Sequence, residues 1–580
     1  MKKINSAKSK DNHRERLQIT SQISITRLWI FRLAAFIVIP VFFFILLEFS
    51  LRIFHFGYPS TALVESKENG ITYVHENSAF VYRFFPKRLA REFTPLRFQA
   101  EKSSDVFRIF ILGGSAAQGT PDAAYSFGRI LDVMLQLRYP DTKFEILSLA
   151  MPAINSHVVL EIAEDCVKYD PDLFIVYLGN NEVIGPYGPG TILTPIFSNI
   201  SLLRFLIKLK ATKIYQLINL TMGKMHLLNS PYQQWKGMEM FLKNQVRLND
   251  PELEITYNNF RSNLENINQI SCENNIKILY STVASNLKDS PPFNSVHRKD
   301  IKISDLKEWN QLYTSGSVRE IAGEYKTAIA NYLKAVEIDS EYADLQYKLG
   351  RCYWNTSKFQ KARRHFVYAR EYDANRFRAD NRINKIIRRS ASAIMGTTFL
   401  ADAVSQIERK SPHGIPGNKF LLEHVHLNFE GNYQVARTIL NQIKLIFPTR
   451  IKNQKIDESI QITDSLCAAY LAYNNYEKHR ILELVLNGFI RQPPFTNQLN
   501  HKETIKDLES ELDSIQLVIQ SQDSNQMAKT YEDALQKRPS DWLLHYKYAG
   551  YLADDNVAKY QKAVHQYEYV IQAVPHDPNT

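Results

Sequence analysis

Residues 107–120 read FRIFILGGSAAQGT, and this stretch decides the fold class. Its first six residues predict a buried strand that ends at two glycines, and a helical pattern follows over 125–138. The serine on this turn, Ser115, has several interpretations. A phosphate-binding loop would carry lysine where Thr120 stands, and a G-x-S-x-G nucleophile elbow normally follows several strands. A reactive serine at a helix N-terminus would have backbone N–H groups beside it to stabilise an oxyanion. Taken alone, the turn favours a serine that merely caps the helix.

The same alternation continues along the chain. Apolar runs at 143–151, 172–179 and 276–284 predict three further strands, with helical patterns at 158–169 and 200–275 between them. Strands separated by helices pair in parallel, so the sequence predicts an α/β fold with helices on both faces of a parallel sheet. Functional residues of such sheets lie beyond the carboxyl ends of the strands.

Polar blocks follow these strand ends. The second strand precedes MPAINS (151–156), and the third precedes GNNE, which ends at Glu182. Far downstream, GNKFLLEHVHLNFEGNYQVA (417–436) places Glu423 three residues before His426.

Together with Ser115, these blocks resemble those of the SGNH (GDSL-type) hydrolase superfamily. That superfamily has a serine after the first strand, a glycine after the second, G-x-N-D after the third and D-x-x-H near the end. This chain has Ala153 in place of the glycine and Glu423 in place of the last aspartate. The resemblance covers about 105–310 and 376–445, and it implies an SGNH/flavodoxin-like sheet.

The resemblance also implies a role for each residue. Ser115 is the nucleophile, His426 is its general base, and Glu423 orients the imidazole and stabilises its cation. The N–H groups of Ser115 and Ala153, with the side-chain amide of Asn181, form the oxyanion hole. It implies no cofactor and no metal ion.

Two neighbouring residues bear on these roles. The N–H of Ala153 serves the site without strain if this alanine has a negative φ. His424 is a rival base, but an extended chain points it to the face opposite His426.

A second stretch, LAAFIVIPVFFFILL (33–47), contains no charge, and with its flanks it extends over 28–56. That length can cross a bilayer as a helix. It lacks the small residues of a cleavage site, so we expect an uncleaved anchor rather than a signal peptide or a buried helix. Residues 1–27 hold seven basic and two acidic side chains. This bias predicts a cytoplasmic N-terminus and an extracytoplasmic body, periplasmic in a Gram-negative bacterium.

Composition excludes several other classes of protein. With 580 residues, 44% hydrophobic and 23% charged, the chain can form sizeable cores. Of the net charge of +11, residues 1–27 carry +5, so the body is nearly balanced and no nucleic-acid partner is expected. The four cysteines form no CxxC pair, which argues against a zinc ribbon or a disulfide scaffold.

Residues 312–373 repeat with a period of 34, which pairs Gly316 with Gly350 and Tyr332 with Phe366. This period and pattern are typical of tetratricopeptide repeats. The repeats interrupt the predicted sheet after its fourth strand. We therefore predict that they form part of the rim of the active site, where they would select a bulky substrate or bind a protein partner.

Two further segments flank the second part of the α/β domain. Arg378, Arg382, Lys385 and Arg389 share a helical spacing, which indicates a solvated basic face or, alternatively, a contact with anionic glycan or lipid headgroups. A weaker repeat with an offset of 36 near the end of the chain predicts an all-α, repeat-like domain over 446–580.

The expected organisation is a basic cytoplasmic tail (1–27), a transmembrane anchor (28–56), a linker (57–104), the first part of the hydrolase (105–310), a repeat insert (311–375), the second part of the hydrolase (376–445) and a helical domain (446–580). The predicted function is that of a membrane-anchored serine esterase, which removes O-acyl groups, acetyl among them, from an envelope glycan or lipid. Two alternatives stay open: an O-acyltransferase that modifies an extracytoplasmic polysaccharide, and an inactive hydrolase fold that serves as a repeat scaffold.

Overall fold

The computed structural model describes residues 25–194, 196–224, 234–454, 456, 459–554, 557 and 559–577. The predicted basic tail therefore lies almost wholly outside the described residues. The chain divides into two compact units. The smaller contains Met1–Tyr58 and Lys208–Asn229, and the larger contains Pro59–Ile207 and Ser230–Thr580.

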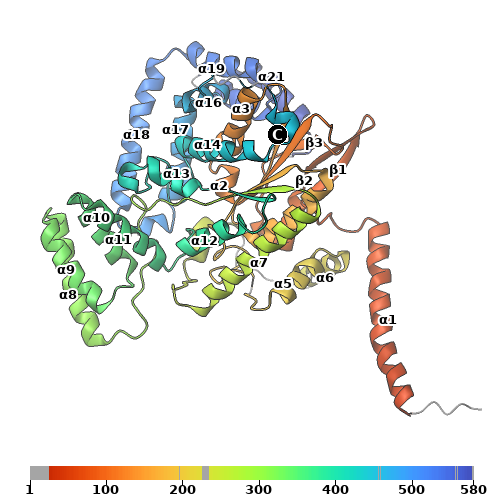
Figure 1. Ribbon diagram of the computed structural model, residues 1–580, viewed down its shortest axis with the longest axis horizontal. Helices are drawn as coiled ribbons and strands as arrows, with labels where there is room; N and C mark the ends of the chain where they lie inside the picture. The colour runs from red at the N-terminus through yellow and green to blue at the C-terminus, as the bar shows by residue number, and fades with distance from the viewer. Residues whose placement is uncertain are drawn as a thin grey trace, which may run out of the picture. The chain divides into compact units, whose positions relative to one another are not determined.

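The larger unit is built on a five-stranded sheet whose strands all run parallel (Figure 1). In sheet order the strands are β5 (Lys143–Ala150), β4 (Val106–Gly113), β6 (Leu173–Tyr177), β7 (Lys277–Ser281) and β8 (Thr398–Ala401). Every residue of β4 is buried, as expected of a central strand that is covered on both faces. Four strands confirm the predicted ones. The fifth, β8, was not predicted because its four residues are too few to show a periodicity.

Helices cover both faces of this sheet, which confirms the predicted α/β class (Figure 1). On one face α3 (Phe127–Arg138) packs against α14 (Phe429–Ile446). On the other, α7 (Pro251–Glu273) packs against α4 (Ser156–Cys166) and α12 (Asn381–Ser390). The continuous helix predicted over 200–275 is wrong. That range contains α5 (Ile200–Lys210), α6 (Lys213–Lys224), a short 3₁₀ turn (Gly237–Phe241) and α7.

Residues 57–104, predicted to be a linker, are instead largely folded. They contain an antiparallel sheet of β1 (Leu63–Glu68), β2 (Ile71–Glu76) and β3 (Arg97–Gln99). Phe98 of β3 makes an edge contact with Phe110 of β4, with ring centroids 5.9 Å apart. The sequence LVESKE of β1 is too polar to indicate a strand on its own.

The repeat insert consists of α8 (Ile303–Ile321), α9 (Tyr325–Ile338), α10 (Ala343–Asn355) and α11 (Phe359–Tyr372). A Cβ on Gly316 would lie 2.5 Å from the Tyr332 ring, and one on Gly350 would lie 2.6 Å from the Phe366 ring. The glycines recur because each helix pair needs this close approach. The predicted helical repeats are therefore confirmed.

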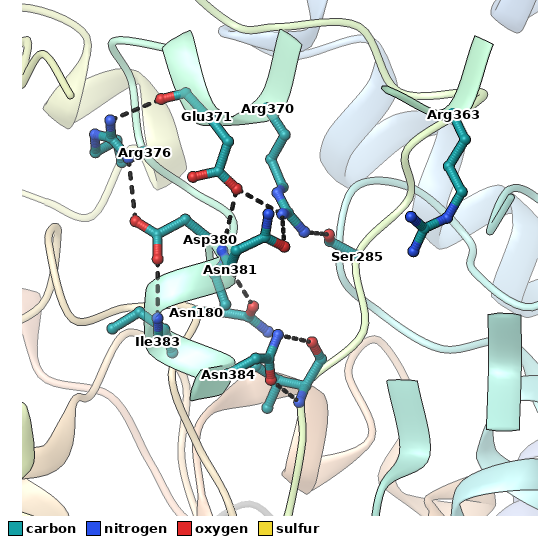
Figure 2. Close-up of polar contacts among 12 residues, drawn as sticks. Asn180, Ser285, Arg363, Arg370, Glu371, Arg376, Asp380, Asn381, Ile383 and Asn384 are labelled. Carbon is teal, nitrogen blue, oxygen red and sulfur yellow. Dashed lines mark hydrogen bonds and ion pairs between the residues drawn. The ribbon is translucent and has the colours of Figure 1, made fainter. Parts of the chain in front are cut away.

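The chain returns from the insert to the sheet through a network of polar contacts (Figure 2). Asn180, at the end of β6, accepts a hydrogen bond from the N–H of Ala379 at 3.1 Å. Asn384 of α12 bonds both backbone groups of Val283, at 2.9 and 3.0 Å, just beyond the end of β7. Asp380 caps α12. The second part of the α/β domain is thus fixed to two strand ends.

The predicted basic face does not form as a unit. Arg378 is buried and pairs with Asp373 at 3.0 Å, and it lies before α12 begins. Arg382 is exposed but pairs with Glu254 at 2.6 Å. The four basic residues do not share one helical face, because α12 starts at Asn381 and Arg378 lies before it.

The rest of the larger unit is helical, as predicted. Its helices are α13 (Ala403–Lys410), α15 (Thr449–Lys452), α16 (Asp464–Tyr470), α17 (Asn475–Val485), α18 (His501–Ser521), α19 (Ser524–Lys537), α20 (Trp542–Ala553) and α21 (Tyr560–Ala573). In the smaller unit, α1 (Ile25–Ile53) is long and apolar. Its segment Trp29–Ile53 has a mean hydropathy of 2.7, and none of the 18 most apolar consecutive residues is buried. By length and composition α1 is a candidate membrane span, a test that a signal sequence also passes.

Candidate active site

Ser115 begins the short helix α2 (Ser115–Gln118) directly after the central strand β4. The turn is possible because Gly113 has no side chain: a Cβ there would lie 2.2 Å from the carbonyl oxygen of Tyr177. Ser115 is half-buried, at the edge of the sheet where sites of this fold class are expected.

A loop far along the chain brings a histidine to this serine. Nε2 of His426 lies 2.8 Å from Oγ of Ser115. The loop is closed by the N–H of Leu422, which donates to the carbonyl oxygen of His426 at 2.8 Å. Within it, Oε1 of Glu423 accepts a hydrogen bond from the N–H of His426 at 2.7 Å and lies 2.6 Å from the Nδ1 of the same residue. This close approach to Nδ1 is not aligned as a hydrogen bond.

His424 takes a different position. Its ring meets the edges of Phe293 and Phe495, with centroids 5.3 and 5.4 Å away, and its Nδ1 contacts the other carboxylate oxygen of Glu423. The structure therefore brings His426, and not His424, to Ser115. Burial lowers the pKa of His426 to about 3 and that of His424 well below its usual range.

Among the described residues, Glu423, His424 and His426 also form a group whose ligand atoms, all within 4.8 Å of one another, are close enough to hold a metal ion. Nε2 of His426 is already occupied by Ser115. The same positions also suit a general base, His426, with the Glu423 carboxylate beside it.

The residues assigned to the oxyanion hole line the same cavity as Ser115. Asn181 is half-buried, and its Nδ2 donates one hydrogen bond to the carbonyl oxygen of Ile154 at 3.1 Å, which leaves its second N–H for a ligand. Ala153 has φ +61°, so the condition under which this alanine would serve the site without strain is not met. The alanine occupies a left-handed conformation that glycine would adopt without strain.

Glu182, the acid of the GNNE block, does not join Ser115. It is buried and accepts hydrogen bonds from the N–H and the hydroxyl of Ser156, at 3.0 and 2.7 Å, so that it caps α4. Burial raises its pKa to about 7.

A cavity of about 640 Å³ opens above Ser115. Its walls are largely apolar, and its large apolar lining residues are Ile184, Trp235, Phe241, Phe377, Phe489 and Phe495. The described residues that line this cavity include none from the repeat insert. The insert lines an adjoining cavity together with Glu423 and Phe495, so its place in the rim of the active site stays a prediction. The segment 487–495 of the C-terminal helical region lines the cavity above Ser115, and the Phe489 ring sits 5.4 Å from that of His426. Sequence reasoning missed this segment, because the two prolines of QPPF (492–495) indicate a break between helices and no site residue.

The C-terminal helices also reach the turn that carries the nucleophile. Nζ of Lys547 lies 2.5 Å from carboxylate oxygens of both Asp122 and Glu477, and Arg480 reaches Asp122 at 3.2 Å. Burial alone would raise the pKa of Asp122, but the Lys547 ammonium, Arg480 and the N–H of Ala124 together outweigh it and the pKa is lowered. This buried cluster joins the loop after α2 to α17 and α20.

Comparison with known proteins identifies one segment. Residues 319–357 match the family model of the TPR repeat, in agreement with the helix pairs of the insert. No curated protein matches the chain. Among solved structures, the crystal structure of an acetyl xylan esterase is 10% identical and has a TM-score of 0.26, over 58% of this chain and 98% of that chain. A TM-score of this size does not establish a shared fold.

Proposed function

We propose that this chain is a serine esterase of the SGNH type, held at a membrane by α1 with its body outside the cytoplasm. The observation that carries the proposal is the 2.8 Å contact between Oγ of Ser115 and Nε2 of His426 on the wall of a largely apolar cavity. A serine hydroxyl becomes a strong nucleophile when a base at this distance accepts its proton. The proposed substrates are O-acyl esters, acetyl esters among them, on an envelope glycan or lipid.

The reaction has two acyl-transfer steps. Oγ of Ser115 attacks the ester carbonyl while its proton passes to Nε2 of His426, and Glu423 beside Nδ1 stabilises the imidazolium. The N–H groups of Ser115 and Ala153 and the amide of Asn181 stabilise the oxyanion. The alcohol leaves with the proton from Nε2. Water then attacks the acyl-serine by the same route and releases the acid.

A second candidate is an O-acyltransferase, in which a sugar hydroxyl replaces water in the second step. The position of Phe489 favours it, because this ring lies against that of the buried His426 and adds an apolar wall near the acyl-serine, where water is less favoured. A protein partner on the repeats is compatible with either reaction.

The test is to treat the full-length protein, in detergent, with a fluorophosphonate probe and to locate the adduct by mass spectrometry. We expect the adduct on Ser115, lost in the Ser115→Ala and His426→Ala variants. His413→Asn is the matched control, because it changes an exposed histidine that stacks on Phe359, outside the residues that line the cavity, and it should keep the adduct. A folded protein without an adduct would support the inactive scaffold.

Labelled acetyl ester with a polysaccharide acceptor then separates the two enzymes. Labelled acetate alone identifies an esterase, and label on the polysaccharide identifies a transferase.

A further inference from the structure

Helix α5 has two apolar faces. Leu203 and Ile207 are buried in the core, whereas Leu202, Phe205 and Leu209 are exposed by 48, 62 and 42%. The exposed three recur at spacings of three and four residues, so they form one stripe along the helix. A helix that only packs on a soluble core needs one such stripe. A second apolar stripe, exposed to solvent, is typical of a surface that contacts a membrane or another protein.

The charged residues within this segment of the chain have one sign. From Ile200 to Lys224 the chain contains five basic residues and no acidic residue. The five are Arg204, Lys208, Lys210, Lys213 and Lys224. Leucine and phenylalanine on one face of a basic helix are typical of helices that lie in the interface of anionic membranes.

The following helix is tied to the end of the candidate span. The N–H groups of Lys213 and Ile214, in the first turn of α6, donate to the two carboxylate oxygens of Glu48 at 3.1 and 3.0 Å. The side-chain amide of Gln216 exchanges two hydrogen bonds of 3.0 Å with the backbone of Tyr58. Glu48 lies near the carboxyl end of α1, and only two residues separate α6 from α5.

We propose that α5 lies in the membrane interface, at the leaflet where the carboxyl end of α1 emerges. Leu202, Phe205 and Leu209 insert among the lipid acyl chains, and the net positive charge of the segment favours anionic headgroups. The occupant of the exposed stripe is therefore lipid. This inference rests on the membrane anchor of the proposed function and adds a second membrane contact to it. Residues up to Ile207 belong to the unit that holds Ser115, so the contact would attach that unit to the membrane at a second point.

The experiment uses the full chain in vesicles of phosphatidylcholine and phosphatidylglycerol. Cys272, the exposed cysteine, is changed to serine, because the other three are buried. Single cysteines at Phe205→Cys, Phe43→Cys in α1 and Asp513→Cys in α18 then carry an environment-sensitive fluorophore. We expect the label at position 205 to be shifted to the blue relative to that at 513, and to lose intensity when the vesicles contain lipid-borne quenchers.

Each outcome decides between occupants. A label at 205 that behaves like the one at 513, while the label at 43 is quenched by lipid, would overturn the interface contact and leave the anchor intact. A label at 205 protected from aqueous iodide but not reached by lipid quenchers would show that protein covers α5, which also overturns the proposal. No lipid quenching at position 43 would remove the anchor on which the proposal rests. None of these results depends on catalysis, so failure here is distinguishable from failure of the proposed esterase.

Discussion

Replacing Ala153 by glycine should stabilise the oxyanion loop. The left-handed conformation, φ +61°, costs an alanine about 1–2 kcal/mol. Glycine removes that strain, but it gives the opened chain additional freedom worth roughly 0.5–1 kcal/mol. The difference predicts a net gain of about 0.5–1 kcal/mol.

Hydrogen exchange followed by mass spectrometry measures this locally, which matters in a chain of several domains. Peptides that cover residues 151–156 should exchange about two- to fivefold more slowly in Ala153→Gly, since 1.4 kcal/mol corresponds to tenfold. Ala330→Gly is the matched control, and it should make its own helix exchange hydrogen faster rather than more slowly. Ala330 is exposed in the interior of α9, where glycine costs about 0.8–1 kcal/mol.

Esterase activity provides the second readout, because glycine keeps the N–H that the oxyanion needs. Faster exchange of 151–156 in Ala153→Gly would refute the strain argument. Slower exchange with a large loss of activity would refute the assignment of this N–H to the oxyanion hole, because glycine keeps that N–H and stabilises the turn that presents it.

Three further predictions follow from the same site and from the repeats. Glu423→Gln should lower kcat by about a hundredfold or more with little change in KM, because the carboxylate stabilises the imidazolium in the transition state. A loss of kcat below about tenfold in steady-state kinetics would contradict this role. Burial lowers the pKa of His426 to about 3, so the neutral base persists in acid and the acid limb of kcat/KM should lie below the ordinary value of 6.5. An acid limb above 6.5 would mean that the Glu423 carboxylate raises the pKa of His426 more than burial lowers it. Gly350→Ala should destabilise the repeats by about 1–3 kcal/mol in thermal unfolding, because its Cβ would meet an aromatic ring at 2.6 Å, whereas Gly550→Ala, with open space around it, should be neutral or stabilising.

The strands were predictable because a strand buried on both faces is a short apolar run. FRIFIL and LFIVY show this directly, and parallel pairing follows from the helices between them. The order of the polar blocks was enough to name Ser115 and His426, although they lie 311 residues apart. In contrast, β1 has charged residues on its exposed face, and its polar sequence LVESKE does not stand out from linker-like residues.

Two features of the site could not be predicted, for physical reasons. The φ of Ala153 is set by how the chain leaves β5 toward α4, and no side-chain pattern encodes that turn when alanine replaces glycine. The position of Phe489 over His426 depends on the packing of the C-terminal helices against the sheet domain. Local periodicity identifies helices, but it does not say which surface they cover.

The ion-pair cluster around Lys547 has a consequence for the timing of biosynthesis. Neither Arg480 nor Lys547 has been synthesised when His426 is added to the chain. At about 5–20 residues per second, roughly 6–25 seconds pass before the ribosome reaches Lys547. Until then, Asp122 lacks the two cations that neutralise it in the folded protein. The ion pairs that hold the loop after Ser115 to the rest of the fold therefore form only once α17 and α20 have been made.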